Sequence, residues 1–161
     1  MTATGKPLEP AMNPWVDAAP FRAHVAHLMA TAELSIGTLA LLTGVQPKAL
    51  ARLMATRDSG LPVVGKISQE LARQLLQVRG SDVRGLSCRS VAAEAVTRRL
   101  RLLRQAGWSE PRLAATIGVD RRSLTALLDG DAPRCTALVA LRAAAAVRTI
   151  GSAGCEEQGA A

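Results

Sequence analysis

The fold is decided by Leu39-Ala40-Leu41-Leu42-Thr43-Gly44-Val45, a stretch whose design returns 74 residues later as Leu113-Ala114-Ala115-Thr116-Ile117-Gly118-Val119. After the alanine, each copy places glycine at offset four, valine at offset five, and leucine at offsets ten and thirteen. Apolar residues recur at helical spacing on both sides of each glycine, which predicts two helices joined by a short turn. An internal repeat of this kind indicates two units of one design.

These positions match what two helices crossing at a steep angle require. A small residue lets the second helix pass close to the first, and glycine tolerates a positive φ in the turn. The valine then plugs the core, and two leucines pack the buried face of the second helix. The residues are Ala40, Gly44, Val45, Leu50 and Leu53 in one copy, and Ala114, Gly118, Val119, Leu124 and Leu127 in the other. The alternative is two generic helical hairpins in a bundle, whose loops need no glycine at that point.

Both copies resemble the λ-repressor/Cro-like (XRE-type) helix-turn-helix domains of bacterial and phage regulators. The run from Lys66 to Leu76 resembles the fourth helix of that family, and the second copy is similar to domains common in actinobacteria and actinophages. The resemblance implies duplex DNA binding and control of transcription. The first copy departs from the family at Thr43, where an aliphatic residue is usual, and in a longer loop before its fourth helix.

The charge balance favours a polyanionic partner. The chain has a formal net charge of +7, with 17 Arg against 3 Lys, and Arg suits bidentate contacts to phosphate and guanine. A GC-rich genome would also enrich Arg over Lys, but it does not account for the net excess of positive charge. Aromatic residues are only 2% of the chain, with no Tyr, which disfavours a single-stranded nucleic-acid binder that stacks bases.

We therefore expect an all-α protein with two small helix-turn-helix domains of four to five helices each. The expected boundaries are a flexible tail over 1–16, a first domain over 17–78, a linker over 79–90, a second domain over 91–150 and a flexible tail over 151–161. The linker is inferred from its glycine, serine and charge content. Because each domain is small, we expect the two to pack together or to share the long helix that begins at Val91.

The second helix of each pair is the expected recognition helix, because its outer face points away from the buried leucines. The candidate base-reading residues are Gln46, Lys48, Ala49 and Arg52 in the first copy, and Arg121, Arg122, Ser123 and Thr125 in the second. Arg can pair with guanine, Gln with adenine, and the Thr methyl can contact thymine. Candidate phosphate contacts near the preceding helices are Ser35, Thr38, Ser109 and Arg112. Exposed arginines on a solvated face, with Asp120 as a helix cap alone, are the plain alternative.

A second basic cluster lies on one predicted helix. Arg98, Arg101 and Arg104 recur every three residues and so share a face. They either contact backbone phosphate in a secondary role or form an ordinary polar face, and the sequence does not separate these two interpretations.

Other kinds of site find little support. His24 and His27 lack a further ligand at matching spacing, and no nucleophile motif or phosphate-binding glycine loop occurs, so we expect no metal, no cofactor, no small-molecule ligand and no enzyme. The three separated cysteines, a polar start and no long apolar run favour a cytoplasmic, nucleoid-associated protein that does not contact the membrane. A redox role for Cys88 stays open. The expected partner is double-stranded DNA, with homodimerisation or an RNA polymerase contact also open. The alternatives are an accessory to a recombinase or transposase, and a helix-turn-helix protein-interaction module.

Overall fold

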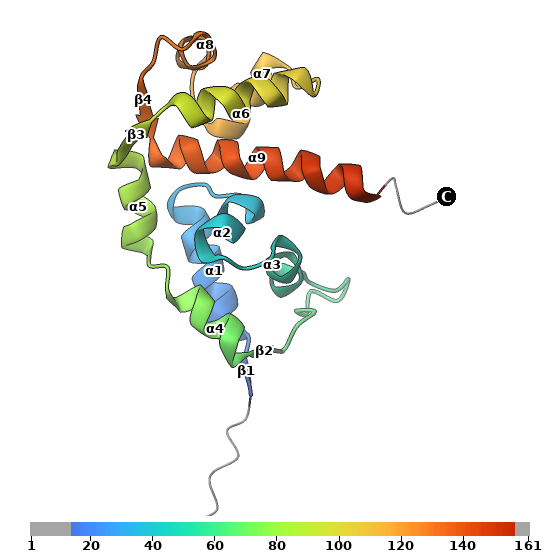
Figure 1. The fold of residues 1–161 in the computed structure, drawn as a ribbon. Coiled ribbons are helices and arrows are strands. Elements are labelled where there is room, and N and C mark those ends of the chain that lie inside the picture. The colour runs from blue at the N-terminus through green and yellow to red at the C-terminus, as the bar shows by residue number, and fades with distance from the viewer. Residues whose placement is uncertain (1–13, 157–161) are drawn as a thin grey trace, which may run out of the picture.

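The protein is all-α, as expected, with short strands between the helices (Figure 1). The computed structural model describes residues 14–156. In order, the elements over this range are β1 (Trp15–Asp17), α1 (Ala19–Thr31), α2 (Ile36–Thr43), α3 (Pro47–Met54), β2 (Lys66–Ser68), α4 (Gln69–Leu76), α5 (Gly80–Cys88), β3 (Ser90–Ala92), α6 (Glu94–Gln105), α7 (Glu110–Ile117), α8 (Arg121–Asp129), β4 (Arg134–Thr136) and α9 (Ala137–Glu156).

The duplication seen in the sequence extends to the whole topology. A first repeat, β1 to α4, and a second repeat, β3 to α9, each run strand, three helices, strand, helix. In each repeat the two strands pair antiparallel, with Val16 opposite Ile67 and Val91 opposite Cys135 at the centre. The paired strands come before the first and after the third of these helices. Their pairing therefore fixes the two ends of each three-helix segment to one another.

The strands were not predicted, and the structure moves three of the expected boundaries. β1 begins at Trp15, inside the segment 1–16 that we expected as a tail; residues 1–13 lie outside the described part. At the other end α9 continues to Glu156, into the segment expected as a tail from 151, and residues 157–161 are not described. Val91 lies in β3, so the long helix expected from that point begins instead at Glu94.

The expected linker over 79–90 contains helix α5. Its Val83 is fully buried in the first core, and α5 packs against α1 and α9. Its start is held by the Asp82 carboxylate, which accepts the backbone N–H of Arg79 at 2.9 Å. The glycine and serine content that indicated a linker is therefore accommodated in a short helix, because tertiary packing outweighs weak helix propensity.

The turn glycines and helix caps follow the sequence closely. Gly44 ends α2 with φ +72° and Gly118 ends α7 with φ +71°, the left-handed conformation that the repeated motif predicts. Ser35 caps α2 by accepting the N–H of Thr38 at 3.1 Å. These local signals set where each helix-turn-helix begins and turns.

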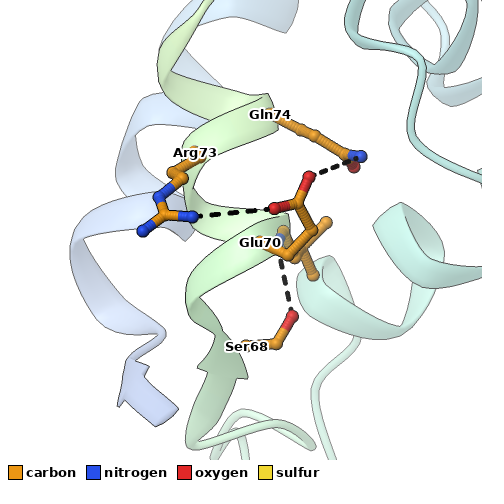
Figure 2. Close-up of polar contacts among 5 residues, drawn as sticks. Ser68, Glu70, Arg73 and Gln74 are labelled. Carbon is orange, nitrogen blue, oxygen red and sulfur yellow. Dashed lines mark hydrogen bonds and ion pairs between the residues drawn. The ribbon is translucent and has the colours of Figure 1, made fainter. Parts of the chain in front are cut away.

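Ser68 likewise caps α4, with its hydroxyl accepting the N–H of Leu71 at 3.2 Å (Figure 2). In the first turn of α4, the Glu70 carboxylate lies 3.9 Å from the Arg73 guanidinium and accepts a hydrogen bond from Gln74 at 3.4 Å. Both partners of the ion pair are about two-thirds exposed, so it adds little stability. It does place a carboxylate beside Arg73 and so reduces the positive field of α4.

Helix α9 lies between α6 of the second repeat and α2 of the first (Figure 1), and its residues contact two hydrophobic cores. One core forms within the first repeat and α5, and the other within the second repeat. Leu138 of α9 packs against the first core, whereas Val139 and Ala143 belong to the second. Helix α9 packs on α2 and α5 as well as on α6 and α7. The two halves of the chain are therefore joined through one shared helix.

Arg142, on α9, also ties the two repeats together. Its guanidinium donates to the carbonyl of Ile117 at 3.3 Å and to that of Ala32 at 2.8 Å, and a longer contact of 3.4 Å reaches Glu33. One side chain thus caps the end of α7 and holds the turn between α1 and α2. A bond between residues 110 positions apart cannot be read from local pattern.

Within residues 14–156, no single helix combines the length and apolar character that a membrane span requires. Helices α1 and α2 reach that criterion only when taken together, and they meet at 109°.

Candidate nucleic-acid interface

Helix α3 has one buried and one solvent-facing side. Leu50 and Leu53 are buried on the core side, whereas Gln46, Lys48 and Arg52 are exposed. Pro47 occupies the first helical turn, where a missing N–H costs no hydrogen bond, so the helix begins beside Gln46. Within the first repeat, three of the four candidate base-reading residues therefore face solvent.

Ala49 is placed differently from the other three candidates. It is half-buried and packs against the first core. Its methyl group helps to pack α3 on the first core, so only part of the Ala49 surface is open to an approaching ligand.

Helix α8 presents the corresponding face of the second repeat. Leu124 and Leu127 are buried, whereas Arg121 and Arg122 are exposed at its N-terminal end. The guanidinium of Arg121 lies 3.9 Å from the carboxylate of Glu110, with the two side chains 87% and 44% exposed. Because this contact is long and exposed, the Arg121 guanidinium can readily leave Glu110 and bind another anion.

The N-terminal turn of α8 is ordered by Asp120. Its carboxylate accepts the backbone N–H of Ser123 at 2.9 Å and the Ser123 hydroxyl at 2.8 Å. These hydrogen bonds lower the pKa of Asp120 below its usual value, and the bond from the Ser123 backbone N–H contributes most. Asp120 thus acts as the expected cap, and the Ser123 hydroxyl already has a partner.

Thr125 also uses its hydroxyl within the helix, donating to the carbonyl of Arg121 at 3.0 Å. This bond leaves the Thr125 methyl, on an exposed residue, as the group that can contact a ligand. It is the group that the thymine contact requires.

The two candidates around α7 differ in their surroundings. Ser109 precedes α7 as its cap residue and is exposed, but its side chain makes no capping hydrogen bond. The guanidinium of Arg112 stacks 3.8 Å above the ring of Trp108, which restricts its orientation. In the first repeat, the hydroxyls of Ser35 and Thr38 bond to each other at 2.8 Å.

The arginines on the basic face of α6 have different contacts. Arg101 donates to the carbonyl of Leu128 from Nε at 3.0 Å and from a terminal nitrogen at 2.7 Å, and so caps the end of α8. Arg98 and Arg101 line a hollow of about 390 Å³ that also contains Glu94. Arg104 is exposed. The three arginines expected to act together on phosphate are therefore not equivalent, since Arg101 has a structural task.

Each repeat has a groove beside its candidate recognition helix, and neither groove was identified from the sequence. In the first repeat, a groove of about 300 Å³ is lined by Arg52, Lys66 and Trp15 among others, and in the second a groove of about 280 Å³ is lined by Ser123 and Arg134 among others. The sequence does carry a repeated pattern at these grooves: Lys66-Ile67-Ser68 and Arg134-Cys135-Thr136 each consist of a cation, an apolar residue and a hydroxyl residue in that order.

The cations at these two grooves have different neighbours. Arg134 donates to the hydroxyl of Ser90 at 2.8 Å and to its carbonyl at 3.0 Å. In the first repeat, Trp15 takes the place corresponding to Ser90, and Lys66 lies opposite Asp17 in the strand register. The two repeats therefore share a framework but not a surface chemistry.

No metal centre is formed by the residues that the structure describes, where no group of three or more His, Cys, Asp or Glu side chains comes together. His24 has a structural position: its Nε2 lies 3.1 Å from the carbonyl of Leu75 and 3.0 Å from that of Val78, and so donates to the end of α4.

The chain matches no protein-family model, no curated protein and no solved structure.

Proposed function

We propose that this protein binds double-stranded DNA sequence-specifically, with α3 and α8 as recognition helices, and that it regulates transcription in the cytoplasm. The observation that carries the proposal is the pair of glycine-turned helix units, each of which presents an exposed, cationic outer face on its second helix. The resemblance to λ-repressor/Cro-like domains points to the same function.

The exposed side chains have the chemistry that the major groove requires. Arg121 and Arg122 lie at the N-terminal end of α8, from which recognition helices contact base edges. Lys48 and Arg52 occupy the outer face of α3. With a net charge of +7, the whole chain attracts a polyanion, so affinity should fall steeply with added salt as counterions are released.

The arrangement of the repeats bears on the target site. Helix α9 of the second repeat packs on α2 of the first, whereas its counterpart α4 contacts α1 and the strands of its own repeat. Contacts of this kind are head-to-tail, unlike the reciprocal contacts of a two-fold dimer. With unlike recognition helices as well, a single chain should favour a site without inverted symmetry.

The test is enrichment of duplexes from a random-sequence library, followed by affinity measurements on the enriched duplex over a series of salt concentrations. The Arg121→Ala/Arg122→Ala variant should lose about 1–3 kcal/mol of binding free energy for each base contact removed, together with base preference at that position. The charge-matched control is Arg84→Ala/Arg89→Ala, which removes two exposed cations from the segment of α5.

If α8 reads bases, its variant loses sequence preference and the control retains it. Equal losses from both variants, with preference unchanged, would assign only a general electrostatic role to Arg121 and Arg122. A chain that binds no duplex even at low salt would refute the proposal and leave a protein-interaction module as the better interpretation.

A further inference from the structure

The first repeat contains a β-hairpin that the second lacks. Residues 55–65 connect α3 to β2, whereas only residues 130–133 connect α8 to β4. Thr56 pairs with Pro62 in an isolated bridge. The hairpin's hydrogen bonds run from Arg57 N to Leu61 O at 2.7 Å, from Gly60 N to Arg57 O at 2.8 Å, and from Val63 N to Ala55 O at 3.0 Å. Gly60 has φ +76°, as expected for a three-residue hairpin loop that ends in a left-handed residue.

The hairpin is attached directly to the end of the candidate recognition helix. The N–H of Ala55 donates to the carbonyl of Ala51 in α3 at 3.0 Å, and the carbonyl of Ala55 accepts from Val63. The first arm of the hairpin is thus bonded to the last turn of α3, and the second arm is bonded to the first at Ala55. Its position relative to α3 is set by hydrogen bonds and not by a loose connection, so a ligand that orients α3 orients the hairpin too.

The outer part of the hairpin exposes apolar surface that no core uses. Leu61 is 62% exposed and Val63 is 37% exposed, although Val64, the next residue, packs against the first core. Arg57 is exposed at the start of the turn, and Asp58 follows it. Since these two charges cancel, the hairpin adds no general attraction for a polyanion. It offers one guanidinium beside an apolar side chain.

We propose that this hairpin is a wing that contacts duplex DNA next to the groove entered by α3, placing Arg57 and Leu61 at the flanking minor groove. The inference rests on the proposed function. Eight residues of α3 span about 12 Å, which is close to the width of the major groove. A segment leaving the C-terminal end of α3 therefore emerges at the rim, where the sugar-phosphate backbone and then the minor groove follow.

The chemistry of the hairpin suits that position. Arginine enters narrow minor grooves, where the negative potential is strongest, and exposed apolar side chains such as leucine wedge between base steps there. The second repeat has only four residues at the corresponding place, so it makes no such contact. The first repeat should then cover a longer stretch of DNA and favour A·T pairs on one flank.

The experiment uses the full chain and the duplex that it enriches from a random-sequence library. Arg57→Ala and Leu61→Ser should each weaken binding about fivefold or more, and Arg57→Ala should also reduce the salt slope by about one phosphate contact. Hydroxyl-radical footprinting should lose minor-groove protection on the flank beside the α3 half-site only. The control is Arg73→Ala on α4, an exposed cation that should leave the footprint and the affinity unchanged within about twofold.

All three positions are exposed, so circular dichroism should show an unchanged fold. If Arg57→Ala and Leu61→Ser keep full affinity and the flanking protection while substitutions in α3 weaken binding, the wing is refuted and DNA binding by α3 stands. If the parent chain enriches no duplex, the wing falls together with the proposed function.

Discussion

The two turn glycines provide a matched pair for testing how the repeats are coupled. Gly44 and Gly118 have nearly identical φ values of +72° and +71°. A methyl group added at Gly44 would meet no atom within 4 Å, whereas one added at Gly118 would meet the guanidinium of Arg142. Alanine should therefore cost the same backbone strain at both sites, and an additional packing penalty only at Gly118.

The magnitudes follow from the contacts. A non-glycine residue in the left-handed conformation costs roughly 1–2 kcal/mol, which is the expected loss for Gly44→Ala. At Gly118 the methyl displaces Arg142 from the carbonyls of Ile117 and Ala32, and hydrogen bonds from a charged donor contribute about 1.5–3 kcal/mol. Gly118→Ala should then cost roughly 2.5–5 kcal/mol in total.

Urea denaturation followed by circular dichroism measures both free energies of unfolding. The decisive control is the Arg142→Ala background, where the new methyl has space. There Gly118→Ala should cost no more than Gly44→Ala does in the parent chain. Equal costs for the two glycine substitutions in the parent chain would refute the assigned role of Arg142 in coupling the end of α7 to the first repeat.

Three further predictions concern the second repeat and the cysteines. Arg101→Ala should lower the free energy of unfolding by about 1.5–3 kcal/mol, because it removes both hydrogen bonds to the end of α8; equilibrium denaturation would show this, and an unchanged midpoint would contradict it. Asp120→Ala should lower the melting temperature at neutral pH. Since hydrogen bonds lower the pKa of Asp120 in the folded state, its contribution is complete above the usual value of 3.8 and is lost as the pH falls through the lower folded value, so the gap between parent and variant should close under strong acid. Burial raises the pKa of the Cys135 thiol, so iodoacetamide should label Cys135 more slowly than the exposed Cys88 at neutral pH, as peptide mass spectrometry would report; equal rates would mean that β4 opens readily.

The turns and helix caps of this protein follow from short-range features of its sequence. The turn glycines Gly44 and Gly118 and the helix cap Asp120 have the roles in the structure that the sequence indicated for them. Each of these signals acts within four residues of itself, through a side chain on a nearby N–H or through a positive φ. Such interactions are legible in a single sequence because their partners are adjacent in it.

The surroundings of the candidate interface residues could be predicted from the sequence only in part. Helical periodicity correctly put Lys48, Arg52, Arg121 and Arg122 on exposed faces. It also grouped Arg101 with its neighbours on α6, although Arg101 bonds to the end of α8, 27 residues away. Periodicity tells which face a side chain occupies, but not what stands opposite that face.

The local sequence pattern is sufficient to predict a pair of glycine-turned helix units with buried leucines and cationic outer faces. Three features depend on long-range packing: a pair of three-residue strands closes each unit, a glycine- and serine-rich segment forms α5, and α9 contributes to both cores. Strands this short carry no periodicity of their own, and each pairs with a distant segment: Val16 lies opposite Ile67, 51 positions further on, and Val91 lies opposite Cys135, 44 positions further on. These partners meet only once the intervening helices have packed. The physical reason is that local hydrogen bonds and φ preferences act between chain neighbours, whereas strand pairing and helix docking depend on surfaces that exist only after the chain has folded.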